Sequence, residues 1–417
     1  MSKAQFSLFA CLIPALALAS CSSQPQPSTA ETTAVDLLAD VRTICEEVPA
    51  RYAYFQDRAA YWPETCARAE AAAVSAGDKS ASLAVLERMV DDLYEPHAAL
   101  NTNNQNSPRL VPTGSDLWIE PIDGRYIITA VRPMSGAAKA GLKVGDELIS
   151  YNSQTPHELA MSRIHAGKAD PAPKRLIWAI NAAVAGTHAA PRQIDIRREG
   201  DLLSFDMEKP EVAQPDELVT AQTLTGNIGY IRLNNSLGNS GTVRAFNAAL
   251  ATLRQTDGLI LDLRETASGG STDIAEPILG RFIDEPAAYQ RTVMPNGLVI
   301  DRKIKPSGPW TYDKPVIVLV GRWTGSMGEG MAVGFDGMSR GTVAGTDMAR
   351  LAGGTEGITL EETGINLNLP TYDLHHLNGT PRHEWTPPHH ATADNGAGPD
   401  LLMQDALSLL TGNQTRP

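Results

Sequence analysis

The chain has little cysteine, few aromatic residues and a deficit of positive charge. Its 417 residues include 4 Cys, 6% aromatic residues, and 35 Lys and Arg against 48 Asp and Glu, for a formal net charge of -13. An acidic surface repels phosphate backbones and releases no counterions, so we expect no nucleic-acid partner. Beyond the N-terminus no apolar segment has membrane-spanning length. The remaining composition is that of a globular protein with roughly two or three domains.

The N-terminus has the pattern of an export signal. Residues 6–19 are mostly apolar and have the length of a signal-peptide core. The Leu-Ala-Ser that precedes Cys21 resembles the lipobox of bacterial lipoproteins. That resemblance implies a lipoprotein signal over residues 1–21, lipidation of Cys21 and a membrane anchor; a plain secretory signal cleaved nearby is the alternative. Residues 22–34 predict a flexible tether. Ser22 after the cysteine favours a periplasm-facing place on the outer membrane over the inner membrane.

The other two cysteines, Cys45 and Cys66, lie 21 residues apart. In an oxidising compartment this spacing predicts a disulfide that stabilises the fold by about 3 kcal/mol. Two buried free thiols are the alternative. Two cysteines without a CxxC partner make a poor zinc ligand set, so we expect no metal and no cofactor.

Hydrophobic spacing divides the rest of the chain into three regions. Residues 35–105 show apolar residues at helical spacing and predict a helical domain. Residues 109–209 contain short strand patterns with turn residues between them. Residues 216–412 alternate strands and helices, the pattern of a layered α/β domain. The predicted fold class is therefore α/β and multidomain.

The middle region contains a recognisable run over residues 131–149. Its order of strand, small-residue helix, Ala-Gly-Leu and Gly-Asp turn resembles the centre of bacterial PDZ domains. Gly141 and Gly145 suit the left-handed positions that end the helix and form the turn. The resemblance implies a PDZ-like domain that binds polypeptide C-termini by strand addition near residues 114–117. Those residues depart from the usual glycine-rich loop, so a scaffold or lid role stays open.

Three segments of the last region resemble the core of tail-specific proteases and of the tricorn protease. They are residues 258–270, with an Asp-Leu-Arg and a glycine pair, residues 315–329, and residues 339–345. The resemblance implies a crotonase-like α/β core and a serine-type peptidase that acts on polypeptides of the bacterial envelope.

Ser326 is the candidate nucleophile. It follows an apolar strand and precedes a predicted helix, so helix N–H groups surround its hydroxyl, which suits an oxyanion. In the family the serine three residues before a glutamate is the nucleophile, and Ser326 stands three before Glu329. By the same resemblance the N–H groups of Met327 and of Gly269 or Gly270 form the oxyanion hole. A simple helix N-cap is the alternative reading of Ser326.

The base departs from the commonest pattern of the family. Tail-specific proteases generally use a lysine about 25 residues after the serine, but that position is Leu351, and residues 346–361 contain no lysine. Arg350 is a poor substitute because it does not lose its proton near neutral pH. The tricorn-like arrangement places a histidine ahead of the PDZ domain, which implies His97 as general base.

The tricorn-like pattern also places a glutamate several tens of residues after the serine. Glu384 lies 58 residues after Ser326 and is the predicted orienting carboxylate. Asp394 is the second candidate, and a surface ion pair with Arg382 is the alternative role for Glu384. Asp262 and Arg264 are expected to form a structural ion pair at the end of a strand.

The predicted function is an acyl-enzyme peptidase with the triad Ser326, His97 and Glu384. Two rivals remain. One is a catalytically inactive peptide- or lipid-binding lipoprotein on the same fold, which the missing lysine favours. The other is an envelope adaptor that works through its PDZ-like groove.

Overall fold

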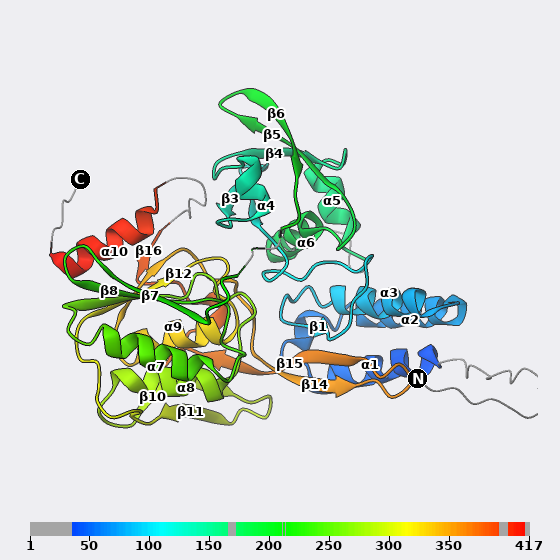
Figure 1. Ribbon diagram of the computed structural model, residues 1–417. Helices are drawn as coiled ribbons and strands as arrows, with labels where there is room; N and C mark the ends of the chain where they lie inside the picture. Colours follow the sequence, from blue (N-terminus) through cyan, green and yellow to red (C-terminus); the bar gives the residue numbers. More distant parts are fainter. Residues whose placement is uncertain (1–35, 166–171, 211, 213, 392–398, 413–417) are drawn as a thin grey trace, which may run out of the picture. The chain divides into compact units, whose positions relative to one another are not determined.

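The computed structural model describes residues 36–165, 172–210, 212, 214–391 and 399–412. The expected signal and tether, Cys21 and Asp394 lie outside the described residues. From Asp36 onward the chain forms one compact unit. It combines helices with a six-stranded sheet and two five-stranded sheets (Figure 1). Among the described residues, no helix combines the length and the apolar character that crossing a bilayer requires.

The first region is helical, as its apolar spacing predicts. Its elements are α1 (Leu37–Arg51), the 3₁₀ turn η1 (Phe55–Asp57), α2 (Trp62–Ser75) and α3 (Lys79–Asp91). The α1 face that carries Val41 and Ile44 is buried against strand residues far along the chain, among them Leu367 and Leu369. This apolar contact attaches the helices to β14 (Gly354–Thr359) and β15 (Asn366–His375) (Figure 1).

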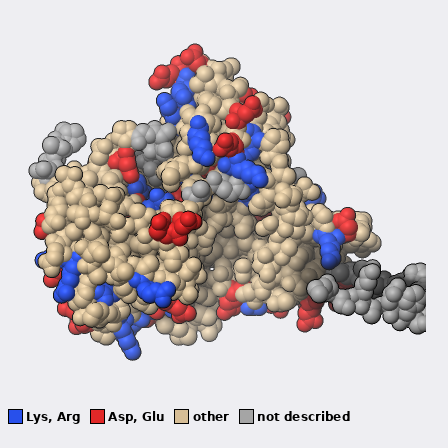
Figure 2. Space-filling model, in the orientation of Figure 1, with Lys and Arg blue, Asp and Glu red and all other residues tan. Residues whose placement is uncertain are grey.

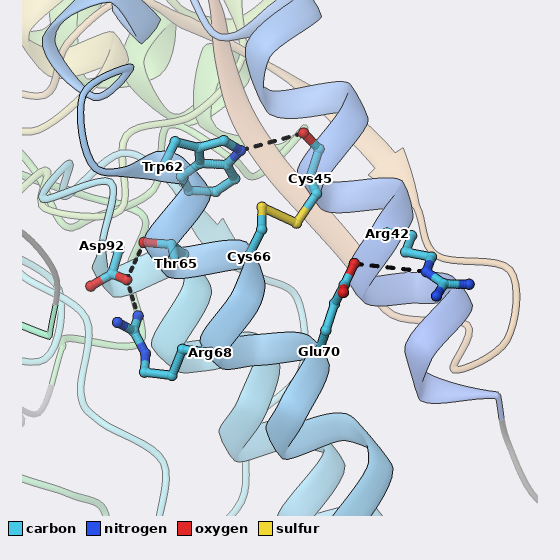
Figure 3. The surroundings of a disulfide bond; sticks show 8 residues. All are labelled: Arg42, Cys45, Trp62, Thr65, Cys66, Arg68, Glu70 and Asp92. Carbon is cyan, nitrogen blue, oxygen red and sulfur yellow. Dashed lines mark hydrogen bonds and ion pairs between the residues drawn. A yellow bond between two sulfur atoms is a disulfide. The ribbon is translucent and has the colours of Figure 1, made fainter.

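The predicted disulfide forms between α1 and α2 (Figure 3). The Cys45 and Cys66 Cα atoms are 5.9 Å apart. Beside the bridge, the Trp62 indole N–H donates to the Cys45 carbonyl at 3.3 Å. On the other side of α2, Thr65 Oγ1 donates to a carboxylate oxygen of buried Asp92 at 2.6 Å, and Arg68 pairs with the same oxygen. These polar contacts order α2 between α1 and the end of α3.

The middle region is an antiparallel sheet of order β2-β3-β4-β5-β6, with three helices packed against it. The bounds are β2 (Leu117–Ile122), β3 (Arg125–Val131), α4 (Gly136–Ala140), β4 (Glu147–Tyr151), α5 (Pro156–Ser162), α6 (Pro173–Ala185), β5 (Arg192–Arg198) and β6 (Asp201–Met207). Gly141 (φ 90°) ends α4 and Gly145 (φ 92°) forms the following turn, both in the left-handed region predicted for them.

The last region contains a six-stranded sheet of order β16-β13-β12-β9-β8-β7. Only the β7–β8 pair is antiparallel. The strands are β7 (Val219–Leu224), β8 (Ile228–Leu233), β9 (Gly258–Asp262), β12 (Val316–Val320), β13 (Thr342–Gly345) and β16 (His389–His390). Its helices are α7 (Thr242–Thr252), α8 (Thr272–Leu279), α9 (Met327–Gly337) and α10 (Leu401–Thr411).

The central strands of this sheet are buried on both faces, which explains their uninterrupted apolar sequences. Leu259 and Leu261 share one cluster with α7, α8 and α9, whereas Ile260 packs with α10 on the other face (Figure 1). The second sheet joins β1 (Ala99–Leu100), β15, β10 (Ala287–Val293) and β11 (Val299–Ile304), with β14 paired to β15. Short 3₁₀ turns follow α8 (η2, Gly280–Phe282) and β15 (η3, Arg382–Glu384).

Buried polar contacts join the antiparallel sheet to the core. Arg132, which follows β3, pairs with Glu265 at 2.9 Å, and both side chains are almost fully buried. Trp323 Nε1 donates to the Ser115 carbonyl at 2.9 Å. Asp262 and Arg264 form the expected ion pair at 2.8 Å, which Arg264 extends to Asp400.

The disulfide gives a first testable prediction. Because it closes the loop between α1 and α2, a Cys45→Ala/Cys66→Ala double variant should lose about 3 kcal/mol of unfolding free energy. Urea denaturation with and without dithiothreitol measures this loss. The reduced wild type should match the double variant, and the variant should not respond to reductant. Equal stability of the oxidised wild type and the variant would contradict the prediction.

Candidate active site

Ser326 occupies a strained position between β12 and α9. Its φ of 49° lies in the left-handed region, which costs energy for a residue with a side chain. The strain is held by Glu329, whose Oε2 accepts the Ser326 N–H at 2.8 Å from within the first turn of α9. The serine is half-buried. The strand, the turn and the helix therefore fix the direction in which the hydroxyl points.

His97 contacts this hydroxyl from the loop between α3 and β1. Its Nε2 lies 3.0 Å from Ser326 Oγ, and its Nδ1 lies 2.9 Å from the carbonyl oxygen of Ala352. Since a carbonyl only accepts hydrogen bonds, Nδ1 must carry the ring hydrogen and Nε2 is left as an acceptor. Burial, together with the positive charge of Arg382, lowers the pKa of His97 to about 4. The imidazole is therefore neutral near pH 7 and able to accept the serine proton.

Three buried charged side chains surround the pair. Glu95 is 8% exposed, Glu329 is 0% exposed and Arg382 is 3% exposed. Burial raises the pKa of the Glu95 and Glu329 carboxyl groups to about 7. The hydrogen bonds that they accept from backbone N–H groups act in the opposite direction and lower the pKa. All three side chains bind backbone atoms of residues 350–353, which we call the 350–353 segment.

The predicted oxyanion residues lie next to the serine. A Cβ on Gly269 would stand 2.4 Å from Ser326 Cβ and 3.2 Å from the Met327 nitrogen, and its φ of 62° favours glycine. The Gly269 N–H donates to Thr266 at 2.9 Å and is thereby occupied. Within the part of the chain that the structure describes, the N–H groups of Gly270 and Met327 make no hydrogen bond. These two donors are therefore available to a ligand.

Glu384 does not contact His97 or Ser326 in the interactions that the structure describes. It is exposed, on η3, and pairs with Lys174 at 3.0 Å; that hydrogen bond lowers the pKa of its carboxyl group. The His97 nitrogen that an orienting carboxylate would bind is instead bonded to Ala352. The structure thus brings Ser326 and His97 together and does not bring Glu384 to them. Its role as the orienting group stays a prediction.

Sequence reasoning missed Glu95, Ala352 and Arg382 as parts of the site. The sequence signal that could have pointed to Glu95 is its position two residues before His97. The sequence suggests only a surface ion pair between Arg382 and Glu384, but Arg382 is buried and donates to the carbonyls of Leu351 and Gly353. A backbone carbonyl such as that of Ala352 leaves no residue-type signal at all.

A cavity of about 600 Å³ lies along the 350–353 segment, whose Arg350 and Ala352 line it. Glu95 and Ala352 form part of its wall. The rest is rich in aromatic rings and cations, among them Tyr94, Trp118, Trp178, Arg58, Arg175 and Arg322. This cavity is large enough for several side chains of an extended ligand. On the face drawn in Figure 2, cationic and anionic side chains are interspersed.

Known proteins resemble this chain over the region that contains Ser326, whereas His97 lies outside the matched family segment. The model of peptidase family S41 matches residues 227–391. The carboxyl-terminal-processing protease of Synechocystis sp. is 26% identical over 337 residues, which cover 79% of this chain and 75% of that protein. The carboxy-terminal processing protease CtpB of Bacillus subtilis is 27% identical over 217 residues, covering 50% of this chain and 41% of that protein.

Solved structures share the fold at low sequence identity. Mature CPAF aligns with a TM-score of 0.61 at 14% identity, covering 91% of this chain and 98% of that one. The photosystem II D1 C-terminal processing protease aligns with a TM-score of 0.55 at 15% identity, covering 86% and 94%. The chain therefore contains a peptidase family S41 domain and is homologous to carboxyl-terminal processing proteases, as a serine-type peptidase.

Proposed function

We propose that the chain is an endopeptidase in which Ser326 is the nucleophile and His97 the general acid and base. The observation that carries this proposal is the 3.0 Å contact between His97 Nε2 and Ser326 Oγ, with Nδ1 bonded to the Ala352 carbonyl. A neutral imidazole with a free Nε2 lone pair is the form that a serine nucleophile needs.

In the proposed reaction, Ser326 Oγ attacks the scissile carbonyl carbon while His97 Nε2 takes the hydroxyl proton. The resulting oxyanion accepts hydrogen bonds from the N–H groups of Gly270 and Met327, with Gly269 allowing the close approach. His97 then returns the proton to the leaving amine, and the acyl-enzyme forms. Water then attacks the ester carbonyl while His97 takes its proton, and His97 passes that proton to Ser326 Oγ as the acyl–oxygen bond breaks, which releases the new carboxyl end and restores the serine.

For the substrate, we propose polypeptides of the bacterial envelope. The cavity that Glu95 and Ala352 line supports an extended ligand, and the left-handed glycines of residues 131–149 support a PDZ-like domain over residues 109–209 that presents or gates it. We further propose a crotonase-like catalytic domain over residues 216–412, a helical domain over residues 35–105, and a lipid anchor at Cys21 on the periplasmic face of the outer membrane.

Loss of either reacting group tests this function. Ser326→Ala and His97→Ala should each lower cleavage of a quenched-fluorescent peptide mixture by about a thousandfold or more, because nucleophile and base act as a unit. Ser339→Ala and His157→Ala are the matched controls; Ser339 also has positive φ (53°) and lies outside the site. Inert wild type that also resists fluorophosphonate labelling would favour a binding protein on the same fold.

A pH profile tests the role of His97. Because its pKa is lowered to about 4, the imidazole keeps its acceptor at pH 5–6 and loses it only as the pH falls through about 4. The rate of fluorophosphonate labelling plotted against pH should therefore show, at its most acidic end, a fall with a midpoint near pH 4. Return to pH 7 before assay checks for acid denaturation. If the most acidic fall in rate has its midpoint near pH 6.5, the ordinary pKa of histidine, the assignment is contradicted.

The glycine beside the serine gives a third test. Gly269→Ala should lower kcat by about a hundredfold, since its Cβ would overlap Ser326 and displace the oxyanion donors. Gly297→Ala is the matched control, because Gly297 also has positive φ (81°) but open space around it. Equal kcat values for the two variants would argue against an oxyanion hole at this loop.

A further inference from the structure

The 350–353 segment is fastened to both reacting residues through backbone groups. Glu329 Oε1 accepts the Arg350 N–H at 2.9 Å while its other oxygen holds Ser326. Arg382 donates to the carbonyls of residues 351 and 353 at 3.0 and 3.1 Å. Arg350 and Gly353 both have a φ of 61°, so the segment bends sharply at each end. The two bends direct its amide and carbonyl groups to different partners.

Glu95 closes a ring around His97. One of its oxygens, Oε1, accepts the His97 N–H at 3.0 Å and the Ala352 N–H at 3.3 Å. The Ala352 carbonyl in turn accepts the His97 Nδ1–H at 2.9 Å. The backbone of His97, its ring and the group that orients the ring are thus tied together by a single carboxylate.

Burying a carboxylate in this place is costly unless hydrogen bonds or a nearby positive charge compensate it. Glu95 is buried, and burying a charge without pairing is strongly unfavourable. The charged and titratable groups that face it are Arg58, Glu329, Tyr52 and Tyr54. The two N–H groups supply part of the compensation, and they belong to the residues that set the ring orientation.

We propose that Glu95 is a positioning residue for the peptidase reaction: it holds the Ala352 carbonyl on His97 Nδ1, so that this carbonyl, rather than a carboxylate, orients the base. The proposal rests on the proposed function of Ser326 and His97. It accounts for the contact of Glu384 with Lys174 instead of His97. It also gives the 350–353 segment, which lacks the lysine of related enzymes, a part in the reaction.

Ionisation of Glu95 should then be visible in the reaction. The charged form accepts both N–H groups more strongly and stabilises the imidazolium that forms in the transition state. Since burial raises its pKa to about 7, this support is present above pH 7 and is lost as the pH falls through that value. This fall in rate near pH 7 is separate from the fall near pH 4 that belongs to His97.

The experiment compares Glu95→Gln and Glu95→Ala in the full chain. Wild-type kcat should rise about tenfold through a midpoint near pH 7. Glu95→Gln keeps an acceptor oxygen but no charge, so its kcat should lack this limb and stay about tenfold below wild type at pH 8, with KM within about threefold. Glu95→Ala should lose about a hundredfold in kcat. The matched control is Glu87→Gln, a carboxylate on α3 whose pKa burial also raises; it should keep the wild-type profile.

Imidazole ¹⁵N shifts, assigned to His97 by the His97→Ala variant, provide a readout that needs no activity. The Nδ1–H form should persist in Glu95→Gln and be mixed with the other tautomer in Glu95→Ala. The proposal is overturned if Glu95→Ala keeps the wild-type kcat, the wild-type fall in kcat near pH 7 and the wild-type His97 tautomer. If Glu95→Ala does not fold, a limb near pH 7 that survives in Glu95→Gln overturns it and assigns that limb to Glu329.

Failure of the proposed function gives a different result. Wild type that neither cleaves peptide nor reacts with fluorophosphonate removes the peptidase assignment of Ser326. The ring-orienting role of Glu95 is then decided by the shifts alone: a mixed tautomer in Glu95→Ala supports it, and an unchanged one overturns it.

Discussion

The antiparallel pairing of β1 with β15 is the constraint on which the candidate site depends. It sets Ala99 opposite Asn368, and His97 stands only two residues before the first of these. Ser326 and His97 are 229 residues apart in sequence, so no local preference brings them together. The apolar packing of the N-terminal helices on β14 and β15 supports the same junction. Disturbing this junction would separate His97 from Ser326, the proposed base and nucleophile.

Buried charge then determines the local geometry. Three ionisable side chains near the serine have almost no access to water, and each must satisfy its hydrogen bonds within the protein. They do so on the amides and carbonyls of the 350–353 segment. A segment held at successive backbone groups has few alternative conformations, so the Ala352 carbonyl is a fixed acceptor for the imidazole. Rigidity of this kind is what a preorganised site requires.

The arrangement is compatible with a mechanism that does not use the lysine that the family resemblance leads one to expect. Leu351 occupies the expected position, and its carbonyl is bound by Arg382. In the proposed mechanism the segment acts through its backbone, and the proton is carried by a histidine from the N-terminal part of the chain. The S41 family domain and the fold are thus compatible with a different division of roles among the residues of the site.

The sequence by itself predicted the regular elements and named Ser326 and His97, the two residues proposed to react. Apolar strands buried on both faces, helical spacing in residues 35–105, the cysteine pair and the serine at a helix start are local or compositional patterns. Only the tertiary structure decided which group faces His97 Nδ1, where Glu384 lies and what Glu95 and Arg382 bind. A carbonyl acceptor belongs to every residue alike, and a buried carboxylate looks the same in sequence as a solvated one. Their roles depend on long-range packing, which no local pattern records.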